Sequence, residues 1–447
     1  MLSLQQLKPK ILKFLLLSFT LVNSLLSDEG FKMQDKFIVR KVVFIGNEKT
    51  KSEIIARELS FSVGSEFDTS KIEYNENRVY GTGLFNKVKI WFERDSTGSD
   101  SVDVYVWVNE RWYIWLFPIF GWRDRDLKKL YYGAGFLHSN FRGRNEKLVL
   151  SFALGYDPWI GIEYLNPWIL GSKYWFYSIE AYYQRVRSRS QMLIDESGLF
   201  HEDNFVFNFL FGKRFGLYKK LWASAGFKNI RVTGDFVHLK TISPSGNDKI
   251  LVIGSGFRYD TRDIPVYPNV GVLFNFAFKL NRLLNYNDAF FVQSGMEFQG
   301  YRKVWVGLIA GRFFVLNSFG RKIPIYSHYY FGYEERLRGY FNKVSEGENI
   351  FGGTVEYRIP VVKQKFFKWK AQLEEFSILR FGLDFAIFGD IGRTWFNNEK
   401  FFKLNYWKGY GVGLNFILPY DLILSVEFAK NDAGKGQFIL DFRGSFR

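Results

Sequence analysis

The residues whose side chains most often do chemistry are scarce in this chain. It has four histidines and no cysteine. His138, His201, His238 and His328 are isolated from one another, with no second ligand at the spacing that a metal ion requires. No Gly-x-Ser-x-Gly segment supplies a nucleophile elbow, and the lack of cysteine removes thiol chemistry and disulfides. The sequence therefore predicts a protein that is not an enzyme and that holds no metal and no cofactor.

The sequence also argues against a nucleotide-binding loop and against nucleic-acid binding. The Gly-Thr-Gly segment at residues 81–83 lacks the third glycine of a phosphate loop and follows a predicted helix rather than a strand. The net charge is +16, but Lys and Arg are spread along the chain instead of gathered on one face, which argues against nucleic acid. The positive excess fits acidic lipid head groups, an acidic client chain, or solvated turns and a basic lumen.

Over the last two-thirds of the chain, polar residues alternate with apolar ones. In one segment Phe274, Phe276 and Phe278 interleave with Asn275 and Ala277. A period of two gives a strand one apolar and one polar face. Aromatic residues make up 20% of the chain, which favours strands and the girdles at lipid interfaces. A sheet with lipid on one side and water on the other must close to pair its backbone, so the pattern predicts a transmembrane β-barrel.

Turns divide residues 112–447 into sixteen predicted antiparallel strands, an even number as expected of a single-chain barrel. The predicted fold class is therefore mainly β. We expect the strands to begin near Trp112, Leu130, Glu146, Trp159, Lys173, Asn204, Leu221, Lys249, Val270, Ala289, Val304, Asn349, Phe381, Gly409, Leu422 and Gln437.

The first 27 residues are predicted to be a signal peptide. Lys8, Lys10 and Lys13 precede an apolar run at residues 14–22, and small residues follow. The run is short for a transmembrane helix, so a retained anchor is the weaker alternative. Export together with a barrel predicts an outer-membrane location.

Residues 36–111 have a different composition and predict a small α/β domain. Residues 37–45 and 102–108 have the pattern of strands, as do residues 87–93, and residues 51–59 have helical spacing. Asp68 can cap a second helix. The predicted order β-α-α-β-β fits a domain of about 75 residues, large enough for a modest core.

Two phrases in this domain carry a resemblance to a known repeat. FIGNEKTKSEII at residues 44–55 and GTGLFNKVKI at residues 81–90 make the domain similar to a POTRA domain, which is periplasmic. The resemblance implies that the domain binds client chains by lending them a sheet edge, through backbone pairing with little sequence preference. We expect residues 87–93 to form that edge.

The barrel region resembles the BamA/TamA-type outer-membrane assembly factors, the bacterial surface antigen family. The likeness rests on five blocks in a fixed order: YDTRDIPVYPNVG at 259–271, YEERLRGYF at 333–341, GGTVEYRIP at 352–360, FAIFGDIGRTW at 385–395 and GYGVGLNF at 409–416. The central members of that family carry several POTRA domains, whereas this chain has room for one.

The resemblance also implies a set of site residues. In the family the sixth extracellular loop folds back into the lumen, and its arginine meets carboxylates on the two following strands. By motif, that arginine is Arg338 and the carboxylates are Glu356 and Asp390. A planar guanidinium suits two carboxylates. Gly339 would permit a sharp turn, and Tyr340 would pack on the barrel wall. The alternative is a solvated loop arginine beside ordinary lumen charges.

The function implied is the receipt of client chains at the POTRA domain and the insertion of β-barrel proteins into the outer membrane. The expected partners are outer-membrane lipids, unfolded outer-membrane or secreted client proteins and other assembly components, without nucleic acid. The alternatives are a protein-translocating pore of the two-partner secretion type and a non-catalytic surface or structural barrel.

The junction between the first and last strands is the expected lateral seam. The first strand, at about residues 112–122, contains Pro118, which cannot donate a backbone hydrogen bond. The last strand, at about residues 437–446, contains Gly444, which favours a kink. Both residues would weaken this one junction, so an assembly factor could open it toward a client strand; end fraying is the alternative.

Overall fold

The computed structural model describes residues 36–95, 100–123, 127–169, 174–187, 190, 201–232, 240–286, 289–371 and 374–442. The predicted signal peptide, His238 and Gly444 lie outside these ranges. Within them, no helix combines the length and the apolar character needed to cross a membrane.

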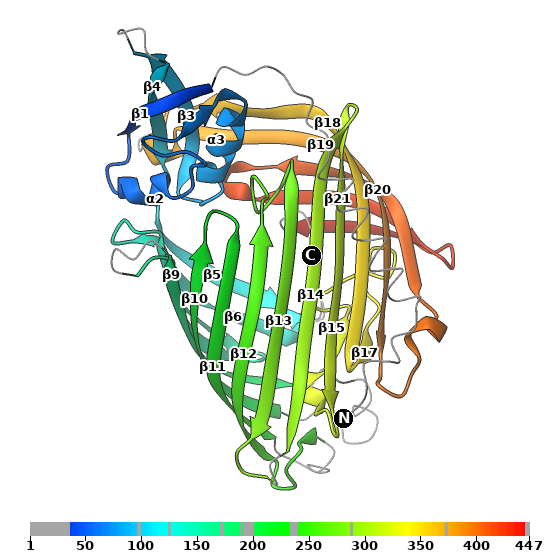
Figure 1. The fold of residues 1–447 in the computed structure, drawn as a ribbon. Coiled ribbons are helices and arrows are strands. Elements are labelled where there is room, and N and C mark those ends of the chain that lie inside the picture. The colour runs from blue at the N-terminus through cyan, green and yellow to red at the C-terminus, as the bar shows by residue number, and fades with distance from the viewer. Residues whose placement is uncertain are drawn as a thin grey trace, which may run out of the picture.

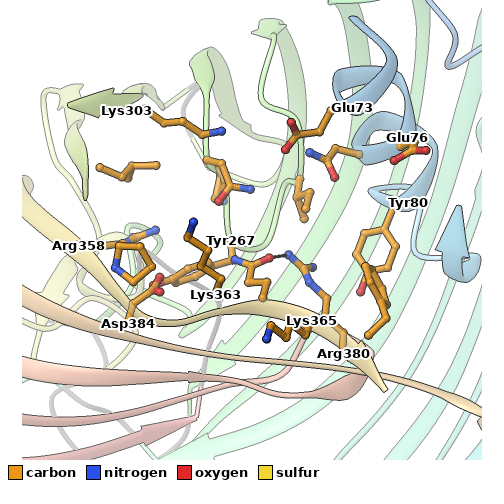
Figure 2. A pocket seen from close by; sticks show the side chains of 18 of the residues that line it. Glu73, Glu76, Tyr80, Tyr267, Lys303, Arg358, Lys363, Lys365, Arg380 and Asp384 are labelled. Carbon is orange, nitrogen blue, oxygen red and sulfur yellow. Dashed lines mark hydrogen bonds between the residues drawn. The ribbon is translucent and has the colours of Figure 1, made fainter. Parts of the chain in front are cut away.

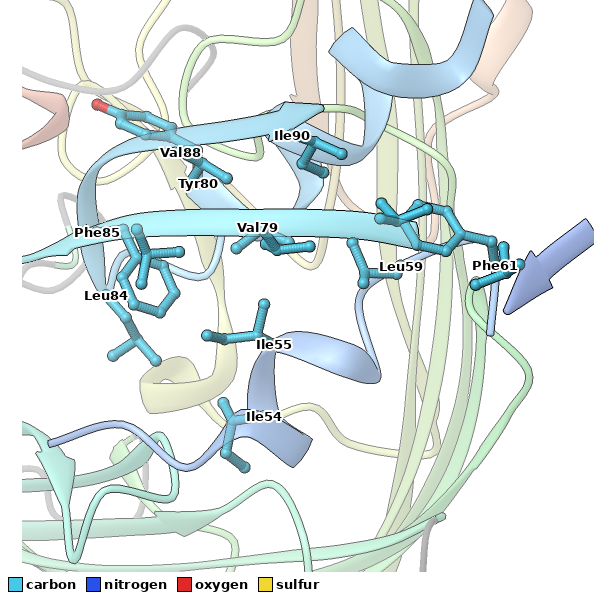
Figure 3. Packing of buried hydrophobic residues seen from close by; sticks show 14 of the residues in the cluster. Ile54, Ile55, Leu59, Phe61, Val79, Tyr80, Leu84, Phe85, Val88 and Ile90 are labelled. Carbon is cyan, nitrogen blue, oxygen red and sulfur yellow. The ribbon is translucent and has the colours of Figure 1, made fainter. Parts of the chain in front are cut away.

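The N-terminal domain is a four-stranded sheet with two helices packed on one face (Figure 3). The sheet order is β2-β1-β4-β3, with β1 parallel to β4 and the other pairs antiparallel. The elements are β1 (Lys36–Ile45), α2 (Ser52–Ala56), β2 (Glu66–Asp68), α3 (Ile72–Tyr80), β3 (Phe85–Arg94) and β4 (Ser101–Glu110). The three-residue strand β2 was not predicted, because it is too short to show an alternation.

The core of this domain follows directly from its sequence pattern. On β4, Val102, Val104 and Val106 are fully buried and alternate with half-buried polar residues. From the helices, Ile55 and Val79 pack against this apolar face. The turn before α3 begins as predicted at Asp68, whose side chain accepts the Ser70 N–H at 3.0 Å.

The rest of the chain forms one antiparallel sheet of sixteen strands (Figure 1), as predicted. Every strand begins within three residues of its predicted start. The strands are β5 (Ile114–Trp122), β6 (Leu130–Phe141), β7 (Glu146–Gly155), β8 (Trp159–Asn166), β9 (Trp175–Arg187), β10 (His201–Phe215), β11 (Lys219–Val232), β12 (Asn247–Asp260), β13 (Gly271–Leu283), β14 (Phe290–Val304), β15 (Gly307–Gly320), β18 (Asn349–Lys368), β19 (Ile378–Trp395), β20 (Trp407–Ile417), β21 (Ile423–Asn431) and β22 (Gly436–Phe442). A short hairpin, β16 (Tyr329–Phe331) and β17 (Ser345–Gly347), lies in the connection before β18.

The two faces of the sheet differ as the alternation predicts. On β19, Asp384, Phe388 and Asp390 are buried on the inner face, whereas Ile387 is half exposed on the outer face. An apolar outer face and a polar inner face are the arrangement that suits lipid outside and water inside.

Backbone pairing does not join the first and last strands in the part of the chain that the structure describes. There, β5 pairs with β6 and β22 pairs with β21, which leaves both at the edges of the sheet. Their outer side chains are correspondingly exposed: Leu116 by 79% and Phe438 by 73%, against 41% for Phe207 on the interior strand β10.

The N-terminal domain lies at one end of the sheet, beside the ends of β18 and β19 (Figure 1). We call this the domain end. These two strands have 20 and 18 residues, more than any other strand in the sheet. Lys49 of the domain pairs with Glu375 between β18 and β19, with 2.9 Å between Nζ and Oε1. The domain is therefore held against the sheet by side chains rather than by the chain connection alone.

Candidate functional site

The loop between β16 and β17 carries Arg338, and the structure places its guanidinium among three carboxylates. Nε and Nη2 donate to the two oxygens of Asp390 on β19, both at 2.8 Å. Nη1 donates to Glu356 on β18 and to Glu427 on β21, both at 3.0 Å. The guanidinium also lies over the Phe388 ring, 3.5 Å from its centroid. The loop is thus tied to three separate strands.

The family resemblance implied Glu356 and Asp390 as partners of Arg338, and it did not include Glu427. Glu427 belongs to the inward-facing polar set of β21, so its strand position was a usable signal. Whether Arg338 reaches Glu427 depends on how far the loop extends along the inner face of the sheet. The sequence does not predict that distance. Glu356 also accepts from Nε of Arg358 at 2.7 Å, so this cluster holds two cations and three anions. We call these five residues the loop clasp.

The two residues after Arg338 fix the backbone and the loop's outer contact. Gly339 has φ of +90°, and a Cβ there would lie 2.9 Å from the backbone oxygen of Lys430, so the position requires glycine. The Tyr340 ring stacks on Trp407 of β20 with 4.9 Å between centroids, and its hydroxyl donates to Asp432. Gly339 thus lies at a sharp turn and Tyr340 packs on the barrel wall, which are the positions that the family resemblance implied.

The loop also contacts the last strand. The Phe341 N–H donates to the Gln437 side chain on β22 at 3.1 Å. On the neighbouring strand β21, the Asn431 side chain donates to the Gly339 carbonyl oxygen at 3.2 Å. The loop that carries Arg338 therefore supports the inner face of the very strand whose outer edge is unpaired among the described residues.

Pro118 lies at the centre of β5, opposite Ala134 of β6. The Tyr113 carbonyl oxygen accepts the Ser139 N–H of β6 at 2.9 Å, and backbone groups of successive residues point to alternate sides of a strand. The register of β5 is unbroken, and Pro118 lies five positions after Tyr113. Its backbone nitrogen therefore points away from β6, toward the edge of β5 that is unpaired among the described residues. The proline removes a donor from the seam and none from the β5–β6 ladder. Gly444 lies outside the described residues.

The start of β5 is held at the domain end by aromatic contacts. The Trp115 ring packs nearly perpendicular to the rings of Phe376 and Tyr420, with its centroid 6.2 Å from that of Phe376 and 5.4 Å from that of Tyr420. Phe376 lies between β18 and β19, and Tyr420 lies between β20 and β21. These contacts bring β5 close to the far side of the sheet at this end without backbone pairing.

The connection between β12 and β13 carries the block at residues 259–271, and it meets the N-terminal domain. Ile264 is buried in the core of that domain. The Asn77 side chain donates to Asp263 at 3.3 Å, and the Tyr74 hydroxyl donates to the Thr261 carbonyl oxygen at 3.3 Å. The sequence did not predict this contact, since nothing in a strand pattern shows which turn a separate domain will touch.

A charged cluster forms a second tie between domain and sheet. Arg214 of β10 donates from both terminal nitrogens to Glu58 of the domain, at 2.7 and 3.0 Å. Arg78 of α3 donates to the same carboxylate at 2.7 Å. Glu58 is buried, which opposes its ionisation, yet the neighbouring Arg214 and Arg78 lower the pKa of its carboxyl group to about 2. We call Glu58, Arg78, Arg214 and the adjacent Arg57 the junction cluster.

The strand β3 is an edge of its sheet, as expected for residues 87–93. Its edge is partly occupied: the Ile90 N–H donates to Glu76 of α3 at 2.8 Å, and the second oxygen of Glu76 lies 3.5 Å from the Lys89 ammonium. A carboxylate of the chain therefore already holds one of the backbone donors that a client strand would use.

The same part of β3 lines a cavity of about 790 Å³ between the domain and the sheet. Figure 2 shows Glu73 and Glu76 on one side of it and Lys303, Lys363 and Lys365 on the other. Seven basic side chains and three carboxylates line the cavity. The β3 edge thus faces a polar and largely basic space large enough for an extended segment.

Comparison with known proteins identifies both parts. The Omp85 superfamily domain matches residues 140–443, more than half of the chain. The POTRA family, described as a surface antigen variable number repeat, matches residues 37–111. The outer membrane protein assembly factor BamA of Buchnera aphidicola subsp. Acyrthosiphon pisum is 28% identical over 79 residues, which are 18% of this chain and 13% of that protein.

Three solved structures share the fold. BamA from Haemophilus ducreyi lacking POTRA domains 1–3 aligns with 93% of this chain and 84% of that chain, at 18% identity and a TM-score of 0.52. CdiB from Escherichia coli aligns with 91% of this chain and 76% of that chain, at 10% identity and a TM-score of 0.55. CdiB from Acinetobacter baumannii aligns with 91% of this chain and 73% of that chain, at 14% identity and a TM-score of 0.50. The chain therefore belongs to the Omp85 superfamily, as an outer-membrane β-barrel protein with a periplasmic POTRA domain.

Proposed function

We propose that this protein is an assembly factor that receives client chains at its POTRA domain and helps to insert β-barrel proteins into the outer membrane. The observation that carries the proposal is a pair of strand edges, one in each sheet, that have no strand partner among the described residues. The β3 edge faces the cavity at the periplasmic end of the barrel, and β5 has an outer edge without a strand partner among the described residues.

Open edges in lipid are costly, so the edge of β5 is a place where a client strand would gain backbone hydrogen bonds. Pro118 weakens pairing at this edge without weakening β5 itself. The loop clasp holds β18, β19 and β21 together from the inside, so the seam could open without loss of the wall beside it. This mechanism requires no bond chemistry, and we propose that the protein is not an enzyme and uses no cofactor.

The second candidate is a protein-translocating pore. Fold likeness does not separate the two, because the CdiB structures match this chain with TM-scores of 0.50 and 0.55 and the BamA structure with 0.52. A pore would use the lumen and would need no open seam. An assembly factor would need the seam to open sideways.

A disulfide lock across the seam separates these candidates. The chain has no cysteine, so one cysteine placed within residues 114–120 and one within residues 438–442 would be the only thiols. We expect the oxidised variant to lose insertion of a β-barrel client into liposomes and to recover it on reduction. Each single-cysteine variant is the matched control. A locked barrel that inserts clients at the wild-type rate would overturn lateral opening and favour the pore.

Deletion of residues 36–110 tests the receptor role in the same assay. We expect the barrel alone to insert clients more slowly, because the β3 edge would no longer deliver them. If the deletion leaves the insertion rate unchanged, the POTRA domain is not the receptor.

A further inference from the structure

We infer that the junction between the POTRA domain and the barrel holds a binding site for a phosphate group. A second cavity, of about 500 Å³, lies there beside the junction cluster. It is separate from the cavity at the β3 edge in its lining residues, and the proposed assembly function does not use it. Its basic lining residues are Arg57, Arg78, Lys147, Arg214, Lys220 and Arg258.

The charges around this cavity do not balance. Three guanidinium groups, from Arg57, Arg78 and Arg214, surround the single carboxylate of Glu58, which leaves a local excess of two positive charges. Burial makes such an excess costly, because charges that are removed from water require partners. Of the two remaining carboxylates in the lining, Asp260 is held by Arg258 and Arg262, whereas Asp263 receives only neutral amide donors from the described residues. The six cations of the lining therefore still outnumber its three carboxylates.

Arg57 carries the clearest unsatisfied donor. Its Nε lies 3.3 Å from Glu58 without hydrogen-bond alignment, and its guanidinium lies 5.5 Å from the centroid of the Trp168 ring. Within the described part of the chain this Nε donates no hydrogen bond, although the side chain is only 13% exposed. The buried Nε of Arg78 likewise has no acceptor there. Burial lowers the pKa of the Arg57 guanidinium below its ordinary value despite the attraction of Glu58.

The barrel wall adds a cation that faces the same space. Lys220 is the second residue of β11 and lies opposite Arg214 in the β10–β11 ladder. Among the described residues no carboxylate lies within ion-pair distance of its ammonium, which instead lies 5.8 Å from the centroid of the Phe176 ring. Cations from both domains therefore converge on one cavity with fewer anions than they need.

A phosphate group fits this arrangement better than a carboxylate does. Phosphate monoesters carry a charge of about −1.5 to −2 at pH 7, which matches the excess of two positive charges around Glu58, and they offer three acceptor oxygens. Guanidinium groups bind phosphate through paired hydrogen bonds. A single carboxylate would neutralise half of the excess. The volume leaves room for the group that carries the phosphate, either a lipid head group or a soluble phosphate ester.

Calorimetric titration of the full chain with inorganic phosphate at constant ionic strength tests the site. We expect saturable binding at one site, weakened at least about tenfold by Arg57→Met, because a hydrogen-bonded charged contact is lost. Lys220→Met should also weaken it, from the opposite wall. Arg40→Met is the matched control, since Arg40 is an exposed side chain of β1 that pairs with Asp103 and does not line the cavity.

The two variants guard against a folding artefact, because a local defect in the POTRA domain would not explain an effect of Lys220 on β11. Absence of saturable binding, or equal affinity in wild type and both variants, would overturn the site. Binding of a glutamate-rich peptide that depends on Arg57, without phosphate binding, would overturn the choice of ligand.

Changing the lipid around the protein distinguishes a lipid head group from a soluble phosphate compound as the natural ligand. In nanodiscs of phosphatidylcholine, free phosphate should bind as in detergent. If added phosphatidic acid abolishes that binding in wild type, the ligand is a lipid head group. If free phosphate binds equally in both kinds of nanodisc, the ligand is a soluble phosphate compound.

Discussion

The loop clasp and the junction cluster have the same arrangement with the signs of the charges reversed: one central charge is surrounded by three of opposite sign. In the loop clasp one loop cation, Arg338, is shared by three carboxylates. In the junction cluster one carboxylate, Glu58, is shared by three guanidinium groups. In each cluster a single central residue holds partners that would otherwise repel one another. That central residue should matter far more than any one of its partners.

The two clusters differ in what they connect. The loop clasp joins a loop to strands of the same barrel, whose positions are already fixed by backbone ladders. The junction cluster joins two domains that share no backbone ladder in the described part of the chain. Loss of the first should therefore free a loop, whereas loss of the second should free a domain.

The largest expected effect is that of Arg338→Ala. Asp390, Glu356 and Glu427 would lose their common cation, and breaking a buried pair typically costs about 3–5 kcal/mol. We expect a folded barrel that no longer assembles clients, measured as SDS resistance of the barrel together with client insertion into liposomes. Arg338→Glu should be worse, because four carboxylates would then share one site.

Two variants sharpen this prediction. Arg321→Ala removes an exposed arginine from the same long connection and should leave insertion unchanged. Adding Glu427→Gln to Arg338→Ala should restore part of the activity, because it removes one of the repelling charges. Full activity of Arg338→Ala would show that the loop clasp is not needed.

The next effect is that of Glu58→Gln at the junction cluster. The neutral amide would leave Arg57, Arg78 and Arg214 without their anion, and the same range of about 3–5 kcal/mol applies to the contact between the domains. We expect the POTRA domain to leave the barrel rim, which spin labels at Val63→Cys and Lys303→Cys would detect as a broader distance distribution.

The control for that variant is Glu53→Gln, which removes an exposed carboxylate from α2 of the same domain. It should leave the distance distribution narrow. A narrow distribution in Glu58→Gln as well would show that the aromatic and hairpin contacts alone hold the domain in place.

The third effect is the pH dependence of the junction cluster. The pKa of Glu58 falls from an ordinary value of 4.5 to about 2 in the folded protein. A lowered folded-state pKa means that the stabilisation is complete above about pH 4.5 and is lost as the pH falls toward 2. The shift corresponds to roughly 3 kcal/mol. Wild-type distances should broaden within that window, whereas Glu58→Gln should show no further change there.

The sequence predicted the barrel better than it predicted the clusters, for a physical reason. Strand starts such as Leu130, Glu146 and Asn349 follow from alternation and turns, which are local properties. Arg338, Glu356 and Asp390 came from the family resemblance, and their contacts lie where the motif order implied. Glu427 was within reach, because it is an inward carboxylate on β21, but a strand pattern does not say how far a loop descends.

The junction cluster was beyond sequence reasoning. Glu58, Arg78 and Arg214 are ordinary surface residues by type, and they become buried only when the domain meets the barrel. That meeting depends on the β12–β13 connection and the long β18–β19 hairpin, whose contacts are set by tertiary packing. The predicted seam residue Pro118 could be placed, whereas Gly444 lies outside the described residues.

The smallest expected effect concerns the β3 edge, the one place where the chain occupies a binding surface of its own. The Ile90 N–H points away from β4 and donates to Glu76 at 2.8 Å, so an incoming strand must displace that carboxylate to use the donor.

A hydrogen bond of this kind contributes about 1–2 kcal/mol. We therefore expect Glu76→Ala to raise the affinity for an extended client peptide by about fivefold to thirtyfold, measured by fluorescence anisotropy on the full chain. Glu73→Ala is the matched control, because Glu73 lines the same cavity from the same helix but donates and accepts no hydrogen bond with β3 in the described structure. Lower affinity in Glu76→Ala would mean that the carboxylate helps to bind the client, and an unchanged affinity would mean that clients dock elsewhere than on β3.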